Sequence, residues 1–311
     1  MLIRWANGKD LSMWHALAAE LCTVFKPSTA IGADSAFIDC ATSRIGEFEA
    51  LTAVDYMSGK NMGFIGFSRA ENRILWLGVS SMYRRKGAGG RLLKTALRQL
   101  DTNQDITVAG FQDDEPGRAL RAFFEKFGFV AVKPVVWDSR AHFEMNRPAS
   151  SEKRGGSFHY RYPMFVKAAN PEYCPVCNSE PAPDGQSDIA CNDIVWVCGE
   201  YPGQGRLFGK IYVMPRKHYF HFEDIPETDA ARFMREVQRT GRALRKVTGA
   251  EKINYELHAN SGAHLHIHLF PRYLDDEFPS APIDYRICEP APYESLAEYQ
   301  WFIERMREEL K

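Results

Sequence analysis

The sequence predicts two consecutive domains, an α/β domain followed by an α+β domain. Its 311 residues exceed what one hydrophobic core usually organises. Residues 1–168 alternate strand-like and helix-like segments, whereas residues 172–311 combine short strands with two long amphipathic helices. The composition, 45% apolar and 25% charged, is that of an ordinary globular protein. We therefore expect domain limits of 1–168 and 172–311.

The hydrophobic patterns assign most of the elements. In the first domain we expect strands at 2–5, 48–57, 61–68, 74–79, 106–111 and 129–137, and helices at 11–25, 89–100 and 117–127. In the second we expect strands at 193–198, 209–214, 252–258 and 264–270, and helices at 226–247 and 294–311.

The stretch 146–156 is rich in loop-forming residues and has two interpretations. It is either a linker between the domains or a loop that leads to a last, aromatic-rich strand at 158–167. We prefer the second interpretation, which closes the first sheet and places the domain boundary at 168–171.

Charge is divided unequally between the two parts of the chain. Residues 1–168 contain 23 basic and 17 acidic residues, and the remainder contains 16 and 23. A mildly basic first domain suits a polyanionic cofactor, but the excess is too small and dispersed to favour nucleic acid as the principal partner. No apolar run is long enough to span a bilayer, and the first residues lack a secretory pattern. A cytoplasmic location without a membrane partner is expected.

A glycine-rich turn follows the expected strand 74–79 and leads into a helix. Glycines at a helix start let backbone N–H groups approach an anion closely, and the helix dipole adds positive potential. Three basic residues, Arg84, Arg85 and Lys86, precede the glycines. The turn therefore suits a pyrophosphate, although many glycine-rich helix starts are only tight turns.

The pattern Arg84-x-x-Gly87-x-Gly89, with the block 119–129 downstream, resembles the conserved blocks of the GNAT acetyltransferase superfamily over residues 1–168. The resemblance implies a mixed sheet that is splayed between its fourth and fifth strands, with helices on both faces. It also implies acetyl-CoA as cofactor and an amine as acceptor. The residues implied in cofactor binding are Leu77 and Val79 for pantetheine and Arg84, Arg85, Lys86, Gly87, Ala88 and Gly89 for the pyrophosphate.

This sequence departs from the superfamily at one position of the second block. Many members have a tyrosine there as general acid to the leaving thiolate, and Phe124 stands in its place. A phenyl ring cannot donate a proton. Either another group serves as the acid, or the domain binds acetyl-CoA without catalysis.

Three histidines alternate with aliphatic residues between His264 and Leu269. In a strand, alternate side chains share a face, so the three imidazoles would lie side by side, about 6.5 Å apart. Three aligned histidines are hard to explain as packing. Their alignment indicates metal binding or phosphoryl chemistry.

This segment and its flanks, 254–257 and 271–276, resemble the histidine triad (HIT) superfamily of nucleotide hydrolases and transferases over most of 172–311. The resemblance implies an antiparallel sheet with helices and a small nucleotide substrate. His266 would attack the α-phosphorus to form a nucleotidyl-imidazole, and His268 would bind phosphate oxygens. Asn260, in the lead-in to the triad, is expected to contact phosphate. HIT relatives are commonly dimers, so a homodimer is an expectation.

Two of the seven cysteines, Cys174 and Cys177, are spaced like metal ligands. In HIT relatives with this pair, the two sulfurs, an upstream histidine and the first triad histidine bind a structural zinc ion. The corresponding histidines here are His218 and His264, and an S₂N₂ set suits tetrahedral zinc. His218 has an alternative role, because in zinc-free relatives it supports the nucleophile.

These expectations combine into a bifunctional enzyme with acetyl transfer in one half and nucleotide hydrolysis in the other. The bond cleaved would be a phosphoramidate, a phosphoanhydride or a nucleotidyl ester. Two alternatives remain: a HIT hydrolase regulated by a non-catalytic acetyl-CoA-sensing GNAT domain, and a HIT nucleotidylyltransferase.

Overall fold

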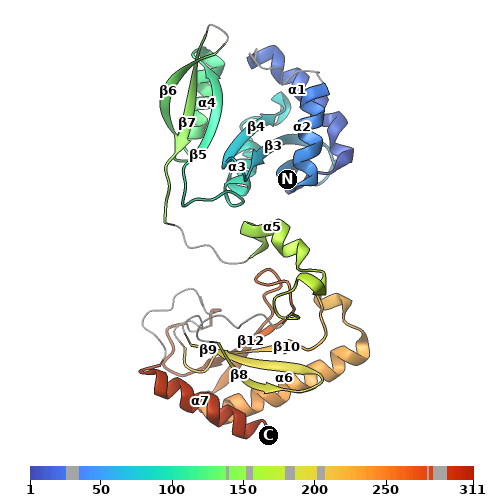
Figure 1. Ribbon diagram of the computed structural model, residues 1–311, viewed down its shortest axis with the longest axis vertical. Coiled ribbons are helices and arrows are strands. Elements are labelled where there is room, and N and C mark those ends of the chain that lie inside the picture. Colours follow the sequence, from blue (N-terminus) through green and yellow to red (C-terminus); the bar gives the residue numbers. More distant parts are fainter. Residues whose placement is uncertain are drawn as a thin grey trace. The chain divides into compact units, whose positions relative to one another are not determined.

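A computed structural model describes residues 1–25, 35–137, 140–151, 157–178, 186–201, 207–278, 280–282 and 293–311. They form two compact units (Figure 1). The first unit comprises Met1–Gly155 with His159–Pro163, and the second comprises Gly156–Phe158 with Met164–Lys311. In this part of the chain, no helix has the length and apolarity needed to cross a membrane.

The first unit is built on a seven-stranded mixed sheet of order β1-β2-β3-β4-β5-β7-β6. Its strands are β1 (Leu2–Trp5), β2 (Ala50–Val54), β3 (Asn61–Ser68), β4 (Arg73–Val79), β5 (Ile106–Gln112), β6 (Val130–Trp137) and β7 (Arg140–Arg147). Strands β4 and β5 are parallel and pair only where Arg73 and Ile74 meet Thr107 and Val108. All other neighbours are antiparallel. The sheet therefore opens between its fourth and fifth strands, which confirms the predicted splay.

Helices cover both faces of this sheet. They are α1 (Leu11–Phe25), α2 (Ser35–Gly46), α3 (Ala88–Leu97) and α4 (Glu115–Glu125). Strand β3 shows how its side chains serve two cores. Phe64 packs with Trp14 of α1 and Phe37 of α2, whereas Phe67 belongs to the cluster that contains Leu92 of α3. The α/β prediction for this half is confirmed.

The segment predicted as a last strand is instead helix α5 (Phe158–Lys167), so that prediction is wrong. Pro163 has no N–H group for a sheet, and non-helical dihedrals at Arg161 separate two helical pieces, so the proline lies near the start of the second. The ring of Tyr162 packs against that of Trp5, with the centroids 4.5 Å apart, which explains the aromatic spacing without a strand. The place beside β5 in the sheet is filled by β7, which the sequence patterns did not reveal.

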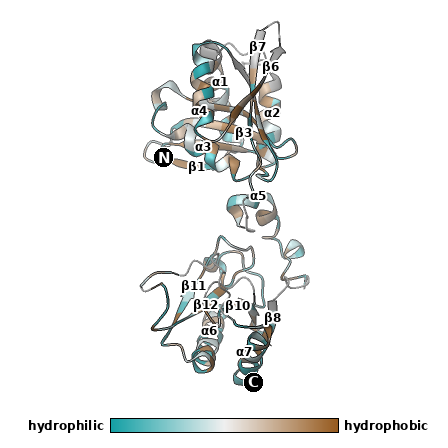
Figure 2. Ribbon diagram, turned by 90° about the vertical axis from the view of Figure 1, so that its left-hand side faces the viewer, coloured by the Kyte–Doolittle hydropathy of each residue, from teal (hydrophilic) through white to brown (hydrophobic). Residues whose placement is uncertain are grey.

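The second unit contains a five-stranded antiparallel sheet of order β11-β12-β10-β9-β8. The strands are β8 (Gln186–Cys191), β9 (Val195–Glu200), β10 (Ile211–Pro215), β11 (Lys252–Glu256) and β12 (Ile267–Arg272). Helices α6 (Glu227–Thr248) and α7 (Leu296–Glu309) pack on the sheet in Figure 1. In Figure 2 each of them combines hydrophilic and hydrophobic residues, as expected for a helix with one buried face. The α+β prediction is confirmed.

The core of the second unit lies between these helices and one face of the sheet. Val213 and Leu269 of the sheet, Phe233 of α6 and Phe302 of α7 belong to one buried cluster. Alternate residues of the strands, including Tyr212 and His268, therefore point to the opposite face. Helices α6 and α7 pack on the other face, so they do not cover Tyr212 and His268.

We expect Phe302→Ala to lower the free energy of unfolding of the second unit by about 3–5 kcal/mol, because the fully buried ring would leave a cavity. Its neighbour Trp301 is 51% exposed, so Trp301→Ala should change that free energy by less than about 0.5 kcal/mol. Urea unfolding of both variants, followed by circular dichroism, measures the difference. Equal losses would contradict the assignment of the core.

Candidate functional sites

The glycine-rich turn lies between β4 and α3. Gly87 is the N-cap of α3 with a φ of +86°, a conformation that disfavours any side chain, and no side chain caps the helix. Arg85 also has a positive φ, of +61°. Arg84, Arg85 and Lys86 are all exposed beside this helix start. The turn therefore combines a helix start uncapped by any side chain with three cationic side chains.

The open part of the sheet leads to this turn. Leu77 and Val79 pair with β3 on one side, at Ile65 and Gly63, while the pairing of β4 with β5 ends at Ile74. A side chain at Gly89 would lie 3.5 Å from Val79, so the end of β4 and the start of α3 meet. The structure thus brings together the predicted pantetheine and pyrophosphate residues.

The two adjacent phenylalanines of α4, Phe123 and Phe124, cannot donate protons. Phe124 is buried in the core, where its ring contacts Phe129 at 5.2 Å. Phe123 lies beside the turn, because its ring would lie 3.5 Å from a side chain at Gly89. Phe124, at the position where many GNAT members have the tyrosine acid, therefore lies in the core.

The histidine triad only partly follows the predicted strand. Strand β12 begins at Ile267, so His264 and His266 precede it. The alternation of side chains between the two sheet faces therefore starts only after these two histidines. The rings of His266 and His268 are 4.8 Å apart. The ring of His264 lies instead among the cysteines. The prediction of three imidazoles on one strand face is therefore wrong for His264, because a bend before β12 turns it away.

The hydrogen bonds of His266 fix its tautomer. Its Nδ1 lies 2.9 Å from the carbonyl oxygen of His264, and since a carbonyl only accepts, Nδ1 carries the proton. Nε2 therefore holds the lone pair. It lies 3.2 Å from the hydroxyl of Ser261. Burial lowers the pKa of His266, which favours the neutral, nucleophilic ring.

His268 lies deeper than His266. It is buried, and burial lowers its pKa far below the ordinary value for histidine. The ring of Tyr212 lies 4.9 Å from it, and the ring of His258 lies 4.6 Å from it on another side. His258 is in turn 3.0 Å from a carboxylate oxygen of Glu256. His268 therefore sits inside a polar cluster of three strands and the segment after β11.

Cys174, Cys177, His218 and His264 form a second cluster, in which the four ligand atoms lie within 4.8 Å of one another. Nδ1 of His264 is 3.6 Å and 3.5 Å from the two sulfurs, and the two Nδ1 atoms are 3.4 Å apart. Tetrahedral zinc places sulfur and nitrogen ligands about 3.6 Å apart and two nitrogens about 3.3 Å apart. The spacing fits a zinc ion.

Both histidines of this cluster present the same nitrogen to it. Nε2 of His218 donates to the carbonyl of Ala169 at 3.0 Å, and Nε2 of His264 donates to that of Pro215 at 2.8 Å. The proton of each ring is thereby held on Nε2, and the Nδ1 lone pairs face the cysteines. Of the two roles weighed for His218, the geometry places it with the cysteines.

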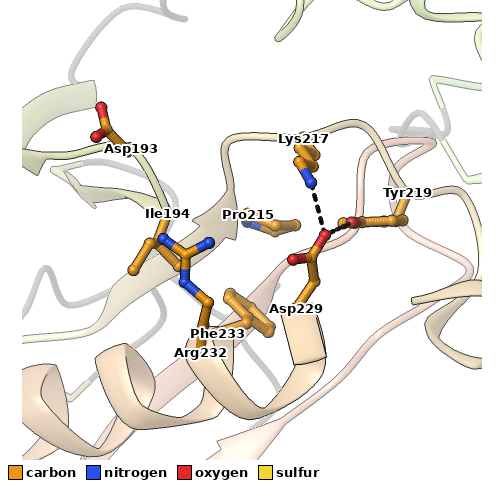
Figure 3. A pocket seen from close by; sticks show the side chains of 8 residues that line it. All are labelled: Asp193, Ile194, Pro215, Lys217, Tyr219, Asp229, Arg232 and Phe233. Carbon is orange, nitrogen blue, oxygen red and sulfur yellow. Dashed lines mark hydrogen bonds and ion pairs between the residues drawn. The ribbon is translucent and has the colours of Figure 1, made fainter. Parts of the chain in front are cut away.

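The loop that carries His218 is anchored to helix α6. In the pocket of Figure 3, the carboxylate of Asp229 accepts hydrogen bonds from Lys217 and Tyr219, each at 2.7 Å. These bonds, that of Lys217 foremost, lower the pKa of Asp229, while burial and the bond to Asp229 raise that of Tyr219 to about 12. The N–H of Leu265 also donates to the carbonyl of Tyr219 at 3.0 Å. The loop is therefore held by hydrogen bonds of the residues on both sides of His218.

Several residues near the triad were not found from the sequence. Asn260, predicted to contact phosphate, is exposed, and its neighbour Ser261 is the residue that reaches His266. Lys210 and Tyr212 enter the cluster from β10 and the residue before it. The period-two pattern of β10 was the available signal, but it needs the register with β12 to place Tyr212 opposite His268.

Comparison with known proteins gives two domain matches. Residues 32–145 match the model of the acetyltransferase (GNAT) domain, and residues 206–275 match that of the HIT domain. A 75-residue stretch is 32% identical to an uncharacterised HIT-like protein of Methanocaldococcus jannaschii, covering 22% of this chain and 56% of that protein. The chain therefore spans about half the length of this curated relative.

Solved structures resemble each part of the chain. A histidine triad protein of Bradyrhizobium japonicum is 23% identical, with a TM-score of 0.37, over 41% of this chain and 92% of its own. A GNAT-family acetyltransferase of Bacillus cereus is 13% identical, with a TM-score of 0.37, over 48% and 97%. On the two domain matches, this chain contains a GNAT acetyltransferase domain followed by a HIT domain.

Proposed function

We propose that the chain is a bifunctional enzyme. The HIT half, 172–311, hydrolyses a nucleotide phosphoramidate, phosphoanhydride or nucleotidyl ester through a nucleotidyl-histidine, and the GNAT half, 1–168, transfers an acetyl group from acetyl-CoA to an amine. The tautomer of His266 carries the first part: a lone pair on Nε2, beside a second buried imidazole. Such a nitrogen is a nucleophile near neutral pH.

The reaction proceeds in two displacements at phosphorus. Nε2 of His266 forms a bond to the α-phosphorus while the bond to the leaving group breaks, and the leaving group departs with the electron pair. The leaving group takes up a proton from solvent, and the hydroxyl of Ser261, 3.2 Å from Nε2, donates its own proton to the carbonyl of His258 at 2.8 Å. Water then attacks the phosphorus and releases a proton to solvent, the phosphorus–nitrogen bond breaks, and Nε2 regains its lone pair. The carbonyl of His264 holds the ring in orientation throughout.

The cysteine–histidine cluster would hold zinc in a structural role. Cys174, Cys177, His218 and His264 would supply four protein ligands, and a shell filled by protein ligands suits a structural ion. The ion would tie the segment around Cys174 to the loop of His218 and to the residue that orients His266. The ligands fit, since their spacing and tautomers match the requirements of the ion.

The GNAT half would bind acetyl-CoA along β4 and at the start of α3. The α3 start without a side-chain cap and Arg84, Arg85 and Lys86 suit a pyrophosphate. The edge of β4 beyond Ile74 has backbone groups available to pantetheine. When bound, the cofactor supplies the activated acetyl group.

A second function is favoured by the aromatic residues in the GNAT half. Phe124 is buried and Phe123 faces the turn, and neither can protonate a thiolate. The half could then sense acetyl-CoA and regulate hydrolysis without catalysis. Free CoA released with a panel of amines would exclude sensing alone, and tight binding without release would support it.

We expect His266→Ala to lower the hydrolysis rate by at least ~10³-fold, because the nucleophile is removed. Rates are measured with adenosine phosphoramidate and dinucleoside polyphosphates. His221→Ala is the matched control, since His221 is exposed and precedes a surface turn. Full activity of His266→Ala would refute the proposed nucleophile.

We expect about one zinc ion per chain in the purified protein and close to none in Cys174→Ser. The reason is that an S₂N₂ site loses most of its affinity for zinc when one of its two sulfur ligands is removed. Elemental analysis by mass spectrometry measures the metal. The exposed Cys191 lies outside the cluster, so Cys191→Ser should keep the ion. Zinc retained by Cys174→Ser and also by Cys177→Ser would rule out this site.

We expect Arg85→Glu combined with Lys86→Glu to weaken acetyl-CoA binding by about 10- to 100-fold, through the loss of positive potential at the helix start. Isothermal titration calorimetry at two salt concentrations measures the change. A double variant of two exposed lysines elsewhere in the first unit, Lys60→Glu with Lys126→Glu, has the same net charge. Equal weakening in both double variants would show that only net charge matters.

A further inference from the structure

The two sulfur ligands of the proposed zinc site can also be oxidised, a property that no step above uses. Cys174 and Cys177 lie in a turn in which the N–H of Asn178 donates to the carbonyl of Cys174 at 3.0 Å. Both sulfurs belong to the cluster whose four ligand atoms lie within 4.8 Å of one another. Two thiolates can be oxidised to a disulfide under mild conditions, whereas imidazoles cannot. The two cysteines therefore add a redox chemistry that a site of histidines would lack.

The two cysteines differ in their access to solvent. Cys174 is fully buried, whereas Cys177 is exposed. A small oxidant such as hydrogen peroxide can therefore reach Cys177 first. An accessible thiol with a second thiol beside it is the arrangement of cysteines that form a disulfide on oxidation. The two other exposed cysteines among the described residues, Cys40 and Cys191, lie outside the cluster.

Zinc and a disulfide make incompatible demands on these sulfurs. A tetrahedral zinc ion with bonds of about 2.3 Å holds two sulfurs ~3.8 Å apart, whereas a disulfide draws them to about 2.05 Å. The sulfurs of a disulfide are no longer thiolates, so they no longer bind the ion. The imidazoles of His218 and His264 would then be the remaining ligands of the cluster. Oxidation of the pair would therefore release the zinc ion.

His264 connects the cysteines to the proposed nucleophile. Its Nδ1 lies 3.6 Å from the sulfur of Cys174 and 3.5 Å from that of Cys177. Its carbonyl oxygen accepts the hydrogen bond from Nδ1 of His266. Loss of the ion would remove the link between His264 and the segment of Cys174. The group that orients His266 would then be less firmly placed.

We propose that Cys174 and Cys177 form a redox-controlled pair, which an oxidant of the peroxide class converts to a disulfide with release of zinc and loss of hydrolysis. The thiolate of Cys177 attacks one oxygen of the peroxide, the oxygen–oxygen bond breaks, and hydroxide leaves. The thiolate of Cys174 then attacks the resulting sulfenic acid, the sulfur–sulfur bond forms, and a second hydroxide leaves. Two electrons pass from the sulfurs to the peroxide, and two protons from solvent convert both hydroxides to water.

The pair rests on the proposed zinc site, and its control of hydrolysis rests on the proposed function. The full, zinc-loaded chain is treated with hydrogen peroxide. A colorimetric chelator follows the zinc, and peptide mass spectrometry after alkylation locates the disulfide. We expect about one zinc ion released per chain, a disulfide between Cys174 and Cys177, and a loss of hydrolysis of at least ~10-fold. Dithiothreitol with added zinc should restore the hydrolysis.

Three variants separate disulfide formation from other oxidation. Cys177→His keeps a zinc ligand at this position but cannot form the disulfide, so peroxide should release its zinc at least ~10-fold more slowly than that of the wild type. Cys177→Asp, which also keeps a possible zinc ligand, replaces it if the first variant does not hold zinc. Cys191→Ser removes an exposed cysteine outside the cluster and should release zinc as the wild type does.

The proposal would be overturned by zinc that stays bound in peroxide, by a disulfide that joins other cysteines, or by equally fast release from Cys177→His. Hydrolysis that is unchanged in a chain with a fully oxidised pair would also overturn it. A chain that hydrolyses no nucleotide would overturn the proposed function, whereas the disulfide and the zinc release would still test the pair.

Discussion

The hydrogen bond from Nδ1 of His266 to the carbonyl of His264 is the constraint on which the HIT half depends. It determines which nitrogen holds the lone pair, and it does so through a backbone atom that cannot change its hydrogen-bonding role. The same residue places its ring in the cysteine cluster. His264 therefore contributes both to the orientation of the proposed nucleophile and to the proposed metal site.

That peptide is supported from a second direction. The ring of His264 donates to Pro215, and the N–H of Leu265 donates to Tyr219, so both ends of the His218 loop are tied to the triad segment. Asp229 then ties Tyr219 to the first turn of α6. A helix that packs on the opposite face of the sheet thereby helps to fix the geometry of the cluster. The ring of His264 thus lies in the cysteine cluster, whereas the ring of His266 lies beside His268.

Much of this arrangement follows from local sequence. The limits of β1, β3 and α1 match the predicted segments, because their apolar periods are uninterrupted. The cluster of Cys174, Cys177, His218 and His264 could be predicted because the two cysteines have the spacing of metal ligands and the resemblance supplied the histidines. The turn at Gly87 could be predicted from the sequence because glycine adopts a positive φ without the steric cost that a side chain would add.

The remaining features depend on long-range contacts. The aromatic pattern of 158–167 looks like a strand, and only its packing on Trp5 explains a kinked helix. His264 leaves the strand face because a bend precedes β12, which alternation alone cannot indicate. Lys210 belongs to no motif. Its burial beside Tyr212 becomes visible only in the folded chain.

The most direct test of the account is to capture the intermediate and locate it. The full chain is mixed with a panel of nucleotide phosphoramidates and dinucleoside polyphosphates, quenched in alkali, which preserves phosphorus–nitrogen bonds, and analysed by peptide mass spectrometry. The account predicts a nucleotidyl group on His266 that is absent from His266→Ala. A nucleotidyl group on another residue, or hydrolysis with no adduct at any time point, would contradict it.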